Sequence, residues 1–381
     1  MLAGASAGFW LPLLHAEPVA QPAKSPSATA VQAQNEPEDL VRFGSKQAKA
    51  RPAGAVRIAS YNVENLFDDK DDPALSGQYE DNGQTKADNE LRGAAAAIRQ
   101  IDADVLALQE VESLDAVKWF RDGWLKDLGY QYVASIDAGD ERGIEQAVLS
   151  RFPITGTRNW LKAPLEGTHP DKAPDAEPGT PMTLHRSPVR VEIALPVEGG
   201  GSQPLTLYVV HHKSGAKSAY WREAEAKKVV ELLKQDQAEN PGVPVAILGD
   251  FNATPDQPTF QTYLTGGLID VFADRVEGDP AWVTHESGRA IDHILANEAF
   301  VRHIAAGSHF VMGVPARPAG ADWRTTPPPE GYGSDHYPVV VDLSFPGVKG
   351  SPSILGDDPA RATSKSERSL DNRGVSEGGG G

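Results

Sequence analysis

The amino-acid sequence predicts an α/β fold, a four-layer sandwich in which two mixed β-sheets are flanked by helices. Short apolar runs typical of buried strands alternate with longer runs typical of helices. Several strand-like runs are separated only by short loops, which favours two sheets packed face to face with the helices outside. The chain has 381 residues. A single α/β domain can account for about 250 of them.

Each predicted element follows from its residue types. Strand candidates are rich in β-branched and aliphatic residues, and helix candidates contain strong helix formers or one apolar face. The predicted strands cover residues 57–63, 104–108, 147–154, 188–195, 205–211, 245–248, 292–296 and 338–343. The predicted helices cover residues 90–101, 115–128 and 219–235. Ser218 is a candidate N-cap of the third helix, where Glu223 and Lys227 are spaced for an ion pair.

The composition excludes several classes of function. The formal net charge of −17 argues against a protein that binds polyanions by general attraction. An acidic enzyme can still cleave a phosphodiester where metal ions and a few cationic side chains supply local positive charge. The chain has no cysteine, which excludes disulfides, thiolate metal sites and a cysteine nucleophile.

The composition also predicts the domain organisation. Residues 1–16 form a possible signal segment, with an apolar run and small residues but no basic flank. Residues 17–54 are predicted as a disordered linker, residues 55–346 as one domain, and residues 347–381 as a disordered tail. We expect a secreted or periplasmic protein, with a cytoplasmic location as the alternative. No apolar run approaches the ~20 residues that a transmembrane helix needs.

The segment Gly249-Asp250-Phe251-Asn252 follows the apolar run 243–248. Side chains alternate along a strand, so Asp250 and Asn252 are expected on the same side, where the strand opens into a loop. A carboxylate beside an amide can hold a water molecule and an anionic oxygen together. The same residue types also begin ordinary turns, so this segment alone leaves both interpretations open.

Polar residues occur at the ends of other predicted strands as well. They are Asn62, Glu110, His211, Asp292, Asp335 and His336. Taken singly, each has an ordinary alternative: Glu110 can be a solvated loop residue and His211 a packed core histidine. Because the strands of a sandwich bring their ends together, the repetition predicts one polar pocket.

These residue types indicate hydrolysis by water. Carboxylates and amides are hard oxygen ligands that suit Mg²⁺ or Mn²⁺, and histidines offer acid–base capacity near neutral pH. The sequence contains no Gly-x-Ser-x-Gly, P-loop or Gly-x-Gly-x-x-Gly motif. The acidic stretch 68–89 is a candidate site for structural Ca²⁺. Its spacing does not fit an EF-hand, and a solvated loop is the alternative.

The chain resembles the endonuclease/exonuclease/phosphatase superfamily, in a deoxyribonuclease-like, bacterial form. The matching segments follow the family's order and span the predicted domain. They are SYNVEN (60–65), LQE (108–110), LSRFPI (149–154), HHKS (211–214), GDFN (249–252), IDHI (291–294) and SDHYP (334–338). Each segment is a weak signal alone, but the ordered set is highly specific.

The resemblance implies a metal site and a water site. Glu110 would be the principal metal ligand, with Asn62 and Asp335 completing or supporting the metal shell. Asp250 would orient the attacking water, and Asn252 would orient the water and a phosphate oxygen.

The resemblance also implies a histidine pair, His211 and His336, on either side of the scissile phosphate. Asp292 would orient His336, and Glu145 would hydrogen-bond His211. Each carboxylate would fix an imidazole tautomer and favour its protonated form. Arg186 resembles an arginine that contacts phosphate. The register favours His211 over its neighbour for the pocket position.

We therefore expect a monomeric, metal-dependent phosphodiesterase that uses in-line attack by water. The preferred interpretation is a nuclease, either endonuclease or exonuclease, with Mg²⁺ or Mn²⁺ as cofactor. A phosphatase or a sphingomyelinase-like phospholipase is the alternative, and the acidic charge favours it. A non-catalytic binding module is a further alternative, although such a protein would be expected to have lost some of the site residues.

Overall fold

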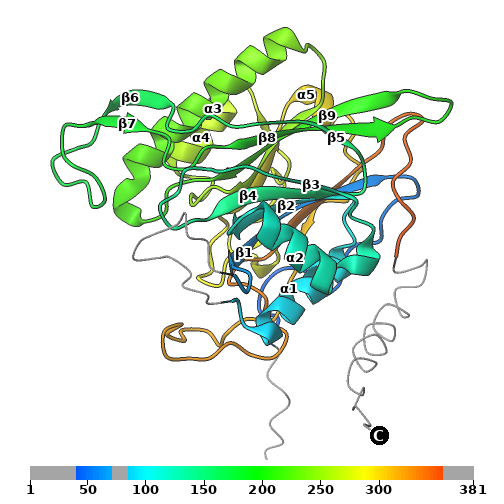
Figure 1. The fold of residues 1–381 in the computed structure, drawn as a ribbon, viewed down its shortest axis with the longest axis horizontal. Helices are drawn as coiled ribbons and strands as arrows, with labels where there is room; N and C mark the ends of the chain where they lie inside the picture. The colour runs from blue at the N-terminus through cyan, green and yellow to red at the C-terminus, as the bar shows by residue number, and fades with distance from the viewer. Residues whose placement is uncertain (1–39, 71–84, 355–381) are drawn as a thin grey trace, which may run out of the picture. The chain divides into compact units, whose positions relative to one another are not determined.

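The structure is a computed structural model that describes residues 40–70 and 85–354. Within these ranges two six-stranded sheets pack face to face, and helices cover their outer faces (Figure 1). The predicted α/β sandwich of two mixed sheets is confirmed.

The first sheet has the strand order β13-β14-β1-β2-β4-β3. Its strands are β1 (Val56–Leu66), β2 (Val105–Val111), β3 (Tyr132–Ser135), β4 (Glu145–Ser150), β13 (Phe310–Val311) and β14 (Val339–Leu343). Strands β1 and β2 are parallel, whereas the other neighbours are antiparallel.

The second sheet repeats this plan, with the order β11-β12-β10-β9-β8-β5. Its strands are β5 (Ile154–Arg158), β8 (Val189–Pro196), β9 (Ser202–His211), β10 (Val245–Asp250), β11 (Ile269–Asp270) and β12 (Asp292–Ala296). Strands β9 and β10 form the parallel pair. A separate hairpin consists of β6 (Pro164–Thr168) and β7 (Pro181–Thr183).

The helices form the two outer layers. Helices α1 (Asp88–Ile101) and α2 (Leu114–Trp124) cover the first sheet, and α3 (Ala219–Glu239) and α4 (Pro258–Thr265) cover the second (Figure 1). The remaining helical segments are α5 (Glu298–Val301) and the 3₁₀ turns Lys126–Leu128, Ala216–Ser218 and Pro280–Trp282. Among the described residues, no helix combines the length and apolarity needed to span a membrane.

The parallel pairs at the sheet centres determine where polar groups meet. Strand β1 contacts β10 and β2 contacts β9 across the interface between the sheets. Parallel neighbours end at the same edge of a sheet, so the carboxyl ends of these four strands lie together. His211 ends β9 and is paired in register with Asp250, which ends β10 and is also paired with Asp292 at the start of β12. The fold thereby gathers residues that are distant in sequence.

Gly249 is required for the close approach of β9 and β10. Its φ is +142°, and a Cβ at this position would lie 2.0 Å from the carbonyl oxygen of Val210. Any larger residue would push the two strands apart. The glycine of the Gly-Asp-Phe-Asn segment therefore allows the register that brings Asp250 beside His211.

Some predicted element boundaries were wrong for local reasons. The range 147–154 is two strands, because Pro153 cannot donate to a ladder and the Ser150 hydroxyl instead accepts the Phe152 N–H at 3.0 Å. The helix predicted over 115–128 ends at Trp124 and continues as a 3₁₀ turn. Ser218 makes no side-chain capping bond, because it belongs to the 3₁₀ turn before α3.

Parts of the predicted linker and tail contact the domain. Phe43 packs against the core, and Ser45 forms a β-bridge with Met312. At the other end, the Ser351 N–H donates to Asp104 at 3.1 Å. The packed unit in the structure therefore includes residues before 55 and after 346. The predicted signal segment, most of the predicted linker and tail, and residues 71–84 of the acidic stretch lie outside the described residues.

Candidate active site

A cavity of about 930 Å³ opens where the ends of β1, β2, β9 and β10 meet. Six of the residues predicted from sequence line it. They are Glu110, His211, Asp250, Asn252, Asp335 and His336. Asn62 and Asp292 are buried behind this wall and bond to residues that form it.

Asp250 occupies the centre of the cluster. Its Oδ2 atom lies 3.5 Å from Nε2 of His211 and 3.8 Å from Nε2 of His336. Asn252 donates its backbone N–H to Oδ1 at 2.7 Å and its amide to Oδ2 at 3.0 Å. Burial raises the pKa of Asp250 to about 6, and the charges of Asp292 and Glu110 add to this rise while that of His336 opposes it.

Asn62 joins Asp250 to Glu110. Its amide nitrogen donates to Asp250 Oδ2 at 3.2 Å and to Glu110 Oε1 at 3.3 Å. Its amide oxygen accepts the Glu64 N–H at 3.0 Å. Both functional ends of Asn62 are therefore engaged within the protein, and the side chain fixes two carboxylates relative to one another.

The backbone around Glu110 is unusual. Glu110 has φ +60° at an irregularity between β2 and β4, and Glu64, Asn65 and Asn252 have φ values between +48° and +55°. The left-handed conformation is uncommon for residues other than glycine, and its cost is commonly retained where a site depends on it. Four such residues at one pocket support a functional role for this region.

His336 and Asp292 form a buried pair. Nδ1 of His336 lies 2.9 Å from Asp292 Oδ2 and 3.0 Å from Oδ1. Burial alone would lower the pKa of His336, but the charges of Asp292 and Asp250 raise it well above its ordinary value. These charges favour the cationic form of His336, whose Nε2 faces the pocket.

The predicted pair of Glu145 and His211 is not formed. Among the described residues, Nδ1 of His211 has no hydrogen-bond partner. Glu145 lies on β4 in the other sheet, and its carboxylate accepts the hydroxyl of Ser135 on β3 at 2.6 Å. Burial, together with the charges of Arg186 and Arg142, holds the pKa of His211 well below its ordinary value, which favours the neutral imidazole.

His212 belongs to the core and does not line the cavity. Its Nδ1 lies 3.1 Å from Glu225 Oε2, and its Nε2 lies 2.7 Å from the Tyr263 hydroxyl. Its carbonyl oxygen accepts the amide of Asn252 at 3.1 Å. His211 therefore lies in the pocket, whereas His212 lies behind it and holds Asn252 in the wall of the cavity.

Arg186 also differs from its predicted placement. It is buried, it forms an ion pair with the buried Asp140, and it does not line the cavity. Arg142 lines the cavity instead, bonded to Asn65 and 3.5 Å from Glu110 Oε2. No sequence motif singles out Arg142, because it lies in the turn before β4 and reaches the site only through tertiary contacts.

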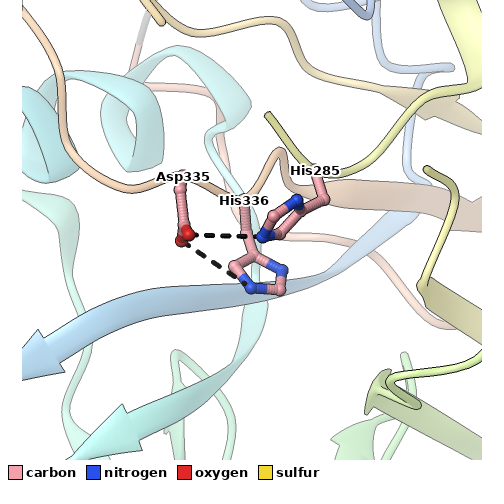
Figure 2. A group of neighbouring side chains, drawn as sticks. All are labelled: His285, Asp335 and His336. Atoms are coloured by element: carbon pink, nitrogen blue, oxygen red, sulfur yellow. Dashed lines mark ion pairs between the residues drawn. The ribbon is translucent and has the colours of Figure 1, made fainter. Parts of the chain in front are cut away.

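His285 is a third histidine at the site that the sequence interpretation missed. Its Nε2 lies 3.2 Å from Asp335 Oδ2, while Asp335 Oδ1 lies 3.7 Å from His336 Nε2 (Figure 2). The two imidazole rings meet edge to face, with centroids 4.6 Å apart. Burial alone would raise the pKa of Asp335. The hydrogen bond with His285 and the charge of His336 instead hold this pKa below its usual range.

The tautomer of His285 follows from its other nitrogen. Nδ1 accepts the backbone N–H of Ser287 at 2.9 Å, so the proton of the neutral ring resides on Nε2. Nε2–H is therefore aimed at Asp335. His285 lies in an irregular turn seven residues before Asp292, where neither periodicity nor a strand end marks it.

Glu64 adds a further acidic group to the pocket. It accepts the Tyr332 hydroxyl at 2.6 Å and the Asp335 N–H at 3.2 Å. Burial raises the pKa of Glu64 to about 7, and the charges of Asp335 and Glu110 add to this effect. Glu64 falls within the SYNVEN segment, so the sequence contained a signal for it.

One comparison with known proteins matches most of the chain. A model described as the endonuclease/exonuclease/phosphatase family matches residues 59–336. A search of curated proteins found no match.

Solved structures with a similar fold were also found. The human nocturnin catalytic domain with bound sulfate has a TM-score of 0.50 and 16% identity, covering 78% of this chain and 96% of that chain. A truncated TDP2 from Caenorhabditis elegans has a TM-score of 0.46 and 14% identity, and the match covers 76% of this chain and 98% of that chain. A mannosyl-6-phosphatase from Bacteroides thetaiotaomicron has a TM-score of 0.45 and 18% identity, and the match covers 76% of this chain and 100% of that chain. At 16% identity the likeness to nocturnin shows the fold alone.

Proposed function

Because the chain belongs to the endonuclease/exonuclease/phosphatase family, whose members are metal-dependent hydrolases of phosphate esters, we propose that it is a phosphodiesterase that cleaves nucleic acid. The observation that carries this proposal is the position of Asp250. One carboxylate with a raised pKa lies between two imidazoles whose pKa values are shifted in opposite directions, downward for His211 and upward for His336. This arrangement suits activation of a water molecule and protonation of an oxygen in the same pocket.

The acidic residues of the pocket fit a divalent cation. Glu64, Glu110 and Asp335 line the cavity together, and after burial the charge of Asp335 is the largest cause of the raised pKa of Glu64. Glu110 and Asp335 would hold the ion, and their oxygen atoms suit Mg²⁺ or Mn²⁺. When bound, such an ion supplies positive charge for the phosphate oxygens. Asn62 would position Glu110 and Asp250, because both ends of its amide already have partners.

Asp250, His211 and His336 would each have a separate role in the reaction. Asp250, held by Asn252, would orient the attacking water. His211, whose neutral form is favoured, would accept a proton at Nε2, and His336, whose cationic form is favoured, would donate from Nε2 to a phosphate or leaving oxygen. The contribution of the protein is therefore mainly positioning and electrostatic stabilisation.

Arg142 is the proposed phosphate ligand in place of Arg186. Its side chain is 28% exposed in the cavity beside Glu110, whereas that of Arg186 is 2% exposed and held by Asp140. A guanidinium pairs well with phosphate oxygens. Arg186 would instead support the wall through the carbonyl of His212, to which it donates at 3.4 Å.

A substrate panel tests the proposal. Purified protein is incubated in Mg²⁺, Mn²⁺ or EDTA with plasmid, linear duplex, single strand, RNA, sphingomyelin and a phosphomonoester. Metal-dependent cleavage of a nucleic acid supports the proposal. Activity on sphingomyelin or the phosphomonoester alone would establish the phospholipase or phosphatase alternative and overturn it. Binding of a nucleic acid without any cleavage would indicate the non-catalytic alternative.

A further inference from the structure

The cavity has a second wall that the catalytic residues do not explain. It consists of Arg42 and Phe43 from the segment before β1, and of residues 317–321 and 323 from the loop after β13. This loop is the orange segment that extends below α1 in Figure 1. A single phosphate needs far less than 930 Å³, a volume at the upper end for pockets that enclose small ligands. The second wall therefore has room for a further part of a substrate.

The second wall carries positive charge. Arg42 and Arg317 share one carboxylate, Glu286, at 3.8 Å and 3.1 Å respectively. Two guanidinium groups on one carboxylate leave a net positive charge, in a chain whose net charge is −17. The Arg42 side chain lines the cavity and is 20% exposed, although its Nε is buried and has no hydrogen-bond partner among the described residues. The positive charge of Arg42 can therefore face an anionic group in the cavity.

The same wall carries an exposed aromatic ring. Trp323 is 64% exposed, more than the other large apolar residues that the structure describes as exposed. The guanidinium of Arg324 lies 4.6 Å from its ring centroid, yet most of the side chain remains open to solvent. An indole beside a cationic group is a suitable platform for a nucleobase, because every base has a flat face that can stack on it.

We propose that Arg42 and Trp323 form a nucleotide subsite, which binds a phosphate next to the scissile one and stacks its base. This inference rests on the proposed function and narrows the substrate class to polynucleotides with an unpaired base at this position. A base within a duplex has both faces covered by its neighbours, so the subsite selects single strands or frayed ends. A phosphomonoester would reach only the catalytic wall and would gain nothing from these residues.

Binding of a labelled single-stranded DNA oligonucleotide tests the subsite. The full chain carrying Asp250→Asn is used in Mg²⁺, so that the strand stays intact, and Kd is measured by fluorescence anisotropy. Trp323→Ala should weaken binding about 5- to 100-fold, and Trp323→Tyr should restore most of it. Arg42→Ala should lower the slope of log Kd against log salt by about 0.7, and Arg42→Lys should preserve it.

Two controls make the result specific. Arg158 is also an arginine beside a tryptophan, Trp160, but neither residue lines the cavity. Arg158→Ala should therefore leave Kd and the salt slope unchanged. In a series of oligonucleotides, a single abasic position is moved along the strand. When the missing base is the one that stacks on Trp323, Trp323→Ala should no longer weaken binding. If Trp323→Ala and Arg42→Ala bind like Arg158→Ala while the parent enzyme cleaves single strands, the subsite is refuted and the proposed function stands. If the parent enzyme cleaves no nucleic acid, the proposed function itself is refuted.

Discussion

Nδ1 of His336 lies 2.9 Å from Oδ2 of Asp292, and both side chains are buried. On the other side of Asp250, Nδ1 of His211 has no such partner among the residues that the structure describes. The pKa of His336 is therefore raised by Asp292 and Asp250 against the effect of burial, while burial lowers that of His211. This difference in charge is the basis for assigning proton donation to His336 and proton acceptance to His211.

The first prediction concerns the pH dependence of kcat. Asp250 must be ionised to orient water, so activity should rise as pH increases through an apparent pKa of about 6. His336 must be protonated, so activity should fall on the alkaline side, above the ordinary histidine value of about 6.5. Asp292→Asn removes the charge that raises the pKa of His336, so the alkaline limb should move to lower pH.

This prediction is checked by kcat–pH profiles of the parent enzyme and Asp292→Asn, with saturating metal at every pH. The comparison rests on the alkaline limb, because the charge of Asp292 also raises the pKa of Asp250 and the acidic limb shifts with it. An alkaline limb that does not move would contradict the assignment of His336 as the donor.

The second prediction separates the two arginines. Arg142→Gln should lower kcat/KM about 10- to 100-fold and leave stability nearly unchanged, because its side chain faces the cavity. Arg186→Gln should instead lower the free energy of unfolding by about 3–5 kcal/mol, because it removes the cation from the Asp140 carboxylate, whose side chain is only 2% exposed. Urea unfolding and steady-state kinetics on both variants test the pair. The reverse pattern would restore Arg186 as the phosphate ligand.

The third prediction concerns His285, which we interpret as a positioning residue for Asp335. His285→Gln can keep a donor near Nε2 and should retain most activity, whereas His285→Leu should lose about 10- to 100-fold. The ¹⁵N NMR signals of the imidazole provide a readout of the tautomer, which should carry its proton on Nε2. Equal activity in both variants, or a proton on Nδ1, would exclude this role.

The fourth prediction distinguishes a metal ligand from a residue that positions it. Glu110→Gln should weaken Mn²⁺ binding about 10- to 100-fold, as measured by the electron paramagnetic resonance signal of the free ion. Asn62→Ala should lose activity while its Mn²⁺ affinity changes much less, because the Asn62 amide oxygen accepts the Glu64 N–H. Comparable losses of affinity in the two variants would show that Asn62 coordinates the ion.

The site residues at the ends of strands could be predicted, because the apolar run before each of them is visible in the sequence. A buried strand such as β10 begins with a continuous apolar run, residues 245–248, and a polar residue soon after such a run marks the edge of the sheet. Asp250, His211 and Glu110 were found in this way, and the family resemblance added Asp292 as the partner of His336. Short elements such as β13 and α4 carried too little pattern to be recognised.

The rest of the site could not be predicted because it depends on tertiary contacts. Arg42 belongs to a segment whose composition indicates a linker, and its position is set by Phe43 packing against the core and by Glu286. His285 lies in a turn without periodicity. The expected pair of Glu145 and His211 failed because Ser135, on a strand that was not predicted, takes the carboxylate.

We propose that Asp250 serves a metal-dependent cleavage of phosphodiester bonds in nucleic acid. The most direct test is the cleavage of single-stranded DNA by the parent enzyme and by Asp250→Asn, each in Mn²⁺ and in EDTA, with circular dichroism confirming that the variant is folded. We predict cleavage only by the parent enzyme in Mn²⁺, with a loss of about 10²- to 10⁴-fold in Asp250→Asn. Cleavage in EDTA, or full activity of Asp250→Asn, would contradict the account.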